Sequence, residues 1–74
     1  MTHEAVVGEL MEVPCGEHSE YFFITGERDE DYIKLKHTGN LKGVPLNTKI
    51  ALCMTMVGDM GVPCIHDKFY QELT

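Results

Sequence analysis

Two pairs of cysteine and histidine residues offer the donor atoms of a zinc site. Cys15 and His18 lie in a turn-forming segment, and Cys64 and His66 are two residues apart on an expected strand, where both side chains share a face. Two thiolates and two imidazoles match the ligand count of a structural zinc. The Cys-x-His spacing differs from the usual zinc knuckles, so we expect no metal and keep these four residues as the alternative zinc set.

A second set of side chains could bind single-stranded nucleic acid, which requires rings on which bases stack and cations that hold phosphates. Residues 21–24 form an apolar run. If Phe22 and Ile24 point inward, the alternation of a strand turns the rings of Tyr21 and Phe23 outward. The alternating segment 32–36 turns one tyrosine and two lysines outward. The expected binding surface comprises Tyr21, Phe23, Tyr32, Lys34 and Lys36.

Catalytic chemistry finds little support in the residue pattern. The sequence contains no phosphate-binding loop, no dinucleotide fingerprint and no defined pair of catalytic carboxylates. A nucleophilic role for Cys15 or Cys64 would require a base beside the thiol and a donor pair for the developing oxyanion, and the sequence identifies neither. We therefore predict a binding module that is not an enzyme and that carries no cofactor.

The charge is distributed unevenly, and it leaves a second interpretation open. Twelve acidic and six basic residues give a formal net charge of -6. Residues 4–31 carry nine acids and one base, whereas residues 32–49 carry four lysines and no acid, which is compatible with phosphate binding. The alternative is that the aromatic residues pack in the core and that the protein is a small acidic protein-interaction or inhibitor module. Its partner would then have a basic surface.

The length and the cysteine count narrow the class of protein. A chain of 74 residues holds one modest hydrophobic core, so we expect a single domain over residues 1–74. Three cysteines cannot all be paired within the chain, which favours a reducing, cytoplasmic setting over secretion. The first apolar run, residues 5–11, is interrupted by Glu9 and has no basic leader, so we expect neither export nor membrane insertion.

Five short strands are expected to position these side chains. Residues that favour turns recur about every dozen positions, a spacing typical of strands joined by hairpins. Residues 49–57 alternate as a core strand, and Gly8 marks a bulge or a bend in a first strand over residues 5–13. Residues 62–67 are expected to form the fifth strand, and residues 67–73 a last short turn. Because a closed barrel removes exposed strand edges, we predict an all-β, five-stranded OB-like barrel, with an SH3-like barrel as the alternative.

The order of these elements resembles the cold-shock domain, an OB-fold family that binds single-stranded RNA and DNA. Residues 21–25 (Tyr-Phe-Phe-Ile-Thr) stand where the family has a Lys-Gly-Phe-Gly-Phe-Ile motif, and residues 31–35 (Asp-Tyr-Ile-Lys-Leu) stand where it has Val-Phe-Val-His-Phe. The similarity extends from about Gly8 to Asp67. The chain departs from the family at the motif lysine, which is absent, and at the histidine of the second motif, which Lys34 replaces. The resemblance implies an OB barrel that binds nucleic acid through the expected ring and lysine side chains.

Overall fold

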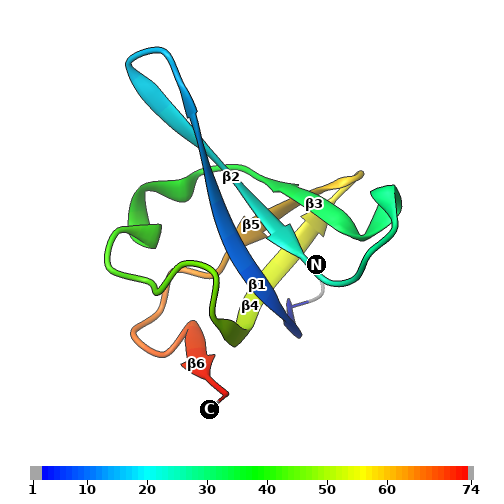
Figure 1. The fold of residues 1–74 in the computed structure, drawn as a ribbon. Coiled ribbons are helices and arrows are strands. Elements are labelled where there is room, and N and C mark those ends of the chain that lie inside the picture. Colours follow the sequence, from blue (N-terminus) through cyan, green and yellow to red (C-terminus); the bar gives the residue numbers. More distant parts are fainter. Residues whose placement is uncertain (1–2, 74) are drawn as a thin grey trace.

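Residues 3–73, which the computed structural model describes, form one sheet of six strands (Figure 1). The strands are β1 (His3–Cys15), β2 (His18–Ile24), β3 (Tyr32–Leu35), β4 (Lys49–Val57), β5 (Met60–Pro63) and β6 (Tyr70–Glu72). Two short 3-10 helices, η1 (Asp29–Asp31) and η2 (Thr38–Leu41), lie in the connections before and after β3. No helix among residues 3–73 is long and apolar enough to span a bilayer.

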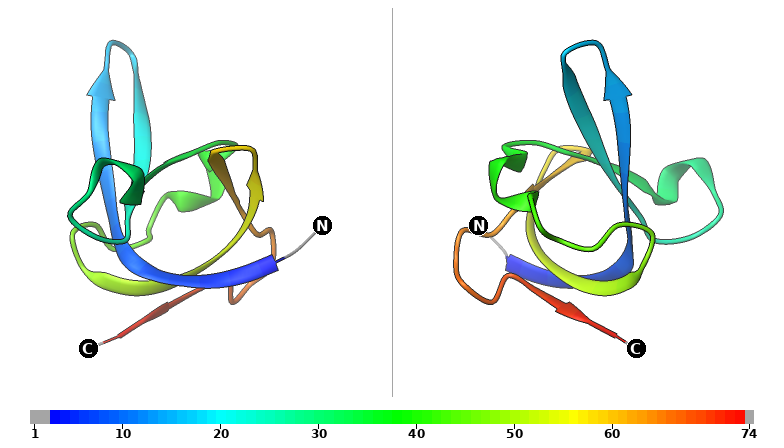
Figure 2. Two further views of the ribbon diagram at one scale, coloured as in Figure 1. Left: turned by 90° about the vertical axis from the view of Figure 1, so that its right-hand side faces the viewer. Right: turned by 60° about the vertical axis from the view of Figure 1, so that its left-hand side comes forward.

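The strand order confirms the predicted all-β, OB-like barrel. The sheet runs β1-β2-β3-β5-β4, and β1 also pairs with β4, which closes the barrel. β3 and β5 pair in parallel, whereas the other strand pairs are antiparallel. The closed ring is visible in Figure 2, with the β1–β2 hairpin projecting from it and β6 lying outside it. β6 is a strand that the sequence does not predict, because its residues were expected in a turn and instead pair with residues 50–52 of β4.

β1 has two neighbours in the sheet, and Gly8 lies where it passes from one to the other. The N-terminal half of β1 pairs with β4 and the C-terminal half pairs with β2, while Glu9 is in register with both. A β-carbon at Gly8 would overlap the carbonyl oxygen of Ile24 and lie 3.0 Å from the Phe23 ring. The missing side chain lets β1 pass close to β2 where it changes neighbours, and β1 curves around the barrel (Figure 2).

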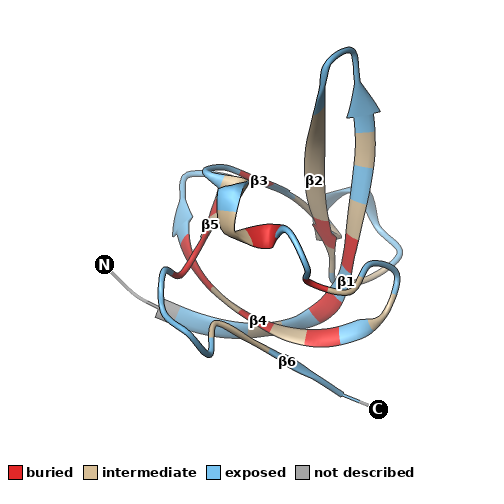
Figure 3. Cartoon of the chain, turned by 90° about the vertical axis from the view of Figure 1, so that its left-hand side faces the viewer, coloured by how far each residue is buried: buried red, intermediate tan, exposed pale blue. Residues whose placement is uncertain are grey.

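The barrel interior is filled by alternate residues of the strands. β4 begins and ends at the predicted residues, and its inward residues Ile50, Leu52 and Met54 have no exposed surface. The connection from β3 to β4 also contributes to the core, because η2 places Leu41 there. The buried segments are shown in red in Figure 3, and the core comprises Leu10, Phe23, Leu35, Leu41, Val44, Ile50, Leu52 and Met54.

The fifth strand lies earlier in the chain than the sequence predicts. A two-residue turn of Gly58 and Asp59, in which Gly58 has a φ of 65°, joins β4 directly to β5. β5 therefore begins at Met60 and ends at Pro63, so the expected bounds of residues 62–67 are wrong. Because proline has no N–H to continue the ladder of hydrogen bonds, it suits the end of this strand.

Candidate functional site

The register of the β1–β2 hairpin decides which rings of β2 face outward. Leu10 lies opposite Phe23, and Met11 lies opposite Phe22. Phe23 has no exposed surface and packs in the core with Leu10, whereas Phe22 is partly exposed on the other side of the strand. The predicted outward orientation of Phe23 is therefore wrong, because a ring without exposed surface cannot stack with a base.

Tyr21 lies on the same side of β2 as Phe23 and is half-buried against the core. Its hydroxyl donates a 3.2 Å hydrogen bond to Oε2 of Glu12, the residue opposite it on β1. Partial burial raises the pKa of Tyr21, and so do the hydrogen bond to the Glu12 carboxylate and its negative charge. The predicted outward orientation of Tyr21 is also wrong, because its ring packs against the core and only its hydroxyl bonds across the hairpin.

The residues of β3 have the orientation that their alternation predicts. Tyr32 is 44% exposed, and Lys34 is exposed on the same side of the strand. Lys36, two residues further, is exposed as well. The β2–β3 register places Tyr32 opposite Ile24 and Lys34 opposite Phe22, so these pairs share a face. The two residues of β2 that were expected in the core therefore lie beside the predicted site residues of β3.

The outward residues form two rows across the sheet, which together we call the outer face. Residues directly opposite one another on neighbouring strands share a face, so the register of four strand pairs defines each row. The first row is Lys49, Glu9, Ile24 and Tyr32, and the second row is Met11, Phe22, Lys34 and Met60. The outer face thus combines two aromatic rings and three aliphatic side chains with two lysines and one carboxylate.

A groove of about 700 Å³ follows the first row of the outer face. It is lined by all four residues of that row and by the loop after β2, residues 25–27. Asp31 holds this loop in place: the backbone N–H of Thr25 donates to its carbonyl oxygen at 2.9 Å, and that of Arg28 donates to its Oδ2 at 3.1 Å. These hydrogen bonds give the groove a wall of defined shape.

The charges around the outer face are mixed. Nζ of Lys34 lies 3.6 Å from Oε1 of Glu20, so this lysine already has a carboxylate partner. Among residues 3–73, Lys36 and Lys49 form no ion pair. Two lysines are therefore available to an anionic ligand, whereas Lys34 would have to exchange its carboxylate for the ligand.

The four residues of the alternative zinc set do not come together. Cys15 and His18 lie at the tip of the β1–β2 hairpin, which projects away from the barrel (Figure 1). Cys64 and His66 lie instead beside Cys53 of β4, and the two cysteines form a disulfide. A single site made of the two predicted pairs is therefore excluded by the fold, and Cys15 is a free, exposed cysteine.

Comparison with protein-family models, with curated proteins and with solved structures finds no match to this chain. The resemblance to cold-shock domains and the binding of nucleic acid therefore stay predictions. The outer face is defined by strand register, burial and charge alone, and these features are the basis of the functional proposal.

Proposed function

We propose that the outer face binds single-stranded nucleic acid and that the protein is a non-catalytic binding module. The observation that carries the proposal is the pairing of Phe22 with Lys34 and of Ile24 with Tyr32 across β2 and β3. These pairs bring rings and a cation together on a sheet face that stays accessible to solvent. Bases stack on accessible rings, and lysines neutralise the phosphates that connect the bases.

The rings and lysines of the outer face would have different roles. Tyr32 is the main stacking platform, because it is the more exposed of the two rings. Phe22, in the neighbouring row, offers a second platform that is partly buried. Lys36 and Lys49 would hold phosphates directly, and Lys34 would join them after leaving its carboxylate. The acidic groups nearby weaken the attraction of phosphates, and added salt should weaken the binding further because it screens the lysines.

Fluorescence anisotropy of labelled oligo(dT) and oligo(U) at low salt tests the proposal. We expect saturable binding that Tyr32→Ala weakens about 5- to 150-fold, because the loss of a stacking platform costs about 1–3 kcal/mol. With three phosphates neutralised, the logarithm of the binding constant should fall with the logarithm of the salt concentration with a slope of about -2. The melting temperature of Tyr32→Ala should remain that of the wild type.

Two lysine variants of equal charge change provide the matched control. Lys36→Glu lies at the end of β3 beside the outer face, whereas Lys68→Glu lies in the exposed connection from β5 to β6. We expect the first variant to weaken binding clearly more than the second. Equal weakening by both variants would indicate attraction to overall charge only, and no binding at tens of micromolar would contradict the proposal.

One observation supports an acidic protein-interaction module as the second candidate. Glu9 and Glu27 line the groove, and Glu20 accompanies Lys34, so carboxylates are interspersed with the exposed rings. A basic partner surface would complement this arrangement. The double variant Glu9→Gln and Glu27→Gln separates the two functions. It should strengthen binding to oligonucleotides, whereas a module for basic partners would lose affinity for a polylysine probe.

A further inference from the structure

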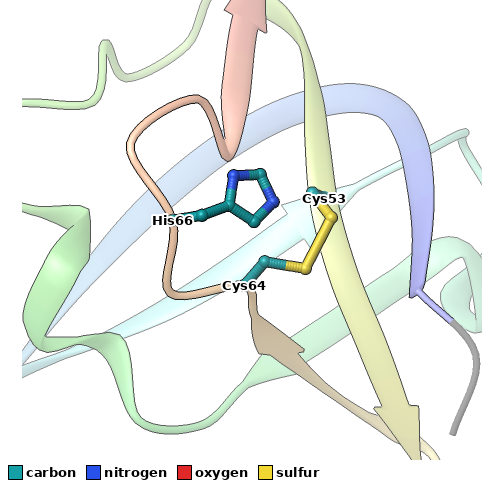
Figure 4. Close-up of side chains that lie close together, drawn as sticks. All are labelled: Cys53, Cys64 and His66. Carbon is teal, nitrogen blue, oxygen red and sulfur yellow. A yellow bond between two sulfur atoms is a disulfide. The ribbon is translucent and has the colours of Figure 1, made fainter.

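We propose that the reduced protein binds zinc through Cys53, Cys64 and His66, and that the disulfide is the oxidised, metal-free form of this site. The donor atoms of the three residues lie within 4.8 Å of one another. In Figure 4 the His66 imidazole extends from the turn after β5 toward the two sulfur atoms. Two thiolates and a neutral imidazole are donors that zinc favours.

The sheet holds the two cysteines together whether or not their sulfur atoms are bonded. Cys53 is an outward residue of β4, and Cys64 directly follows β5, the antiparallel neighbour of β4. The N–H of Cys64 donates a 3.0 Å hydrogen bond to the carbonyl oxygen of Cys53, and the two α-carbons are 5.6 Å apart. This α-carbon distance is typical of a hydrogen-bonded antiparallel pair, so both thiols should stay side by side after reduction.

His66 belongs to a turn that is anchored near both of its ends. At the start, Nδ2 of Asn40 donates a 2.9 Å hydrogen bond to the carbonyl oxygen of Cys64. At the end, the N–H of Cys53 donates a 2.7 Å hydrogen bond to the carbonyl oxygen of Phe69. The turn therefore begins at Cys64, which is hydrogen-bonded to Cys53, and its last residues are hydrogen-bonded to Cys53 again. This arrangement keeps the imidazole close to both sulfur atoms.

Tetrahedral coordination requires the two sulfur atoms to separate and the imidazole nitrogen, now within 4.8 Å of them, to stay near. Zinc bonds of about 2.3 Å to sulfur and about 2.0 Å to nitrogen place neighbouring donor atoms about 3.3–3.8 Å apart. Small side-chain rotations reach this spacing once the disulfide is open. His66 is exposed, so water or an added ligand can supply the fourth donor from the side of the imidazole.

Zinc and the disulfide exclude each other at this site. A dithiol reductant supplies two electrons and two protons to the Cys53–Cys64 bond, which yields two protein thiols and the disulfide of the reductant. Zn²⁺ then displaces both thiol protons, and its two positive charges balance the two thiolates. The oxidised form offers no thiolate, and His66 by itself does not retain the ion. Zinc binding is thereby linked to the redox state of the protein.

A second group of residues with closely spaced donor atoms serves as the internal control. Cys15, His18 and Glu20 also have donor atoms within 4.8 Å of one another, on the projecting hairpin. This group has one sulfur and a carboxylate, whereas the site at β4 has two sulfurs. Cobalt bound by two thiolates has a stronger sulfur-to-metal absorption than cobalt bound by one, so the two groups differ in their spectra.

Titration of the reduced protein with cobalt(II), followed by displacement with zinc, tests the proposal. We expect one equivalent of cobalt with sulfur-to-metal absorption. Native mass spectrometry should show a zinc adduct that is two protons lighter than the sum of reduced protein and metal. His66→Gln, a change of an exposed residue, should weaken zinc binding about tenfold or more, because losing a residue that merely orients a ligand already reduces metal affinity about 10- to 100-fold. Cys15→Ser should bind as the wild type does.

Several results would overturn the proposal. They are loss of the cobalt spectrum in Cys15→Ser, unchanged zinc affinity in His66→Gln, and equal zinc binding by the oxidised and reduced proteins. Circular dichroism after reduction covers the case in which the metal-free dithiol form unfolds. In that case one equivalent of zinc should restore the β spectrum, and failure to restore it would also contradict the proposal.

Discussion

The two walls of the barrel differ in how far the chain covers their outward side chains. On the wall around β4, Thr55 and Cys64 are only 8% and 4% exposed, and β6 extends the sheet beside the strand. On the wall formed by β1, β2 and β3, Tyr32 remains 44% exposed above a groove. The outward side chains beside the disulfide are therefore covered, whereas the rings of the outer face stay accessible. The accessible rings are the basis of the binding proposed for the outer face, and the experiments below test whether the two walls differ as their exposure predicts.

The largest expected effect comes from the adjacent phenylalanines of β2, one of which is buried in the core while the other lies on the outer face. Phe23→Ala removes a ring without exposed surface and should lower the free energy of unfolding by about 3–5 kcal/mol. Phe22→Ala removes a partly exposed ring from the outer face and should cost about 1 kcal/mol, while weakening oligonucleotide binding. Urea titration measures both losses. Similar losses for the two variants would contradict the assignment of these rings to opposite sides of β2.

Gly8→Ala tests the place where the two walls join. The new β-carbon would overlap the carbonyl oxygen of Ile24, a backbone atom that cannot rotate away. We expect a loss of about 3 kcal/mol, at the upper end of the usual cost of overpacking. Gly39→Ala is the control, since no atom lies within 4 Å of its β-carbon. Melting temperatures should separate the two variants by about 12–24 °C. Equal temperatures would show that β1 does not pass close to Ile24 of β2 at Gly8.

Reduction of the Cys53–Cys64 disulfide tests the covered wall alone. The bond joins cysteines 11 positions apart, and opening a loop of this size should lower the free energy of unfolding by about 2–3 kcal/mol. Binding of oligonucleotides by the folded protein should not change, because the disulfide is not part of the outer face. Urea titration and anisotropy with and without reductant, in a metal-free Cys15→Ser background, measure both quantities. A loss of binding on reduction, with the barrel still folded, would show that the two walls are coupled.

The orientation of β3 and β4 could be predicted from the sequence because both strands alternate between apolar and other residues. In β4 the alternation even gives the bounds of the strand. The run of residues 21–24 has no such alternation, since all four side chains are apolar or aromatic, and periodicity by itself cannot orient it.

Information to orient β2 is nevertheless present in the sequence. A two-residue turn after Cys15 pairs that residue with His18 and fixes the register of the whole hairpin. Glu9 must face outward because burial of an unpaired carboxylate is costly, and this register places it opposite Ile24. Ile24 therefore faces outward with Glu9, and so does Phe22, which is two residues from Ile24 on the same strand. Turn length combined with one charged residue would have corrected the prediction.

Other features could not be predicted from local sequence patterns. β6 has only three residues, and its pairing with β4 depends on where the preceding turn ends. The approach of His66 to Cys53 depends on hydrogen bonds from residues distant in the chain, including one from Asn40. Such non-local contacts are set by the closed barrel, and short sequence windows do not contain them.

The smallest expected effect concerns Tyr21, which packs against the core while its hydroxyl reaches Glu12 on the hairpin. Tyr21→Phe keeps the ring and removes the hydrogen bond, so stability at neutral pH should fall by less than about 1 kcal/mol. The pKa of Tyr21 is raised in the folded protein, so folding favours the neutral phenol. This contribution is present below the unfolded-state pKa of about 10 and is lost as the pH rises through the folded-state pKa.

Urea titrations between neutral pH and the strongly alkaline range compare the wild type with Tyr21→Phe. Both proteins share the other ionisable groups, so the difference between them isolates the Tyr21 phenol. The stability of the wild type should decline more steeply above about pH 10, because only the wild type loses a proton that the folded state holds more tightly. Parallel declines would show that neither the partial burial of the Tyr21 ring nor its bond to Glu12 persists in solution. The ring would then be free to leave the packed side of β2, and the contrast between Tyr21 and the exposed rings of the outer face would weaken.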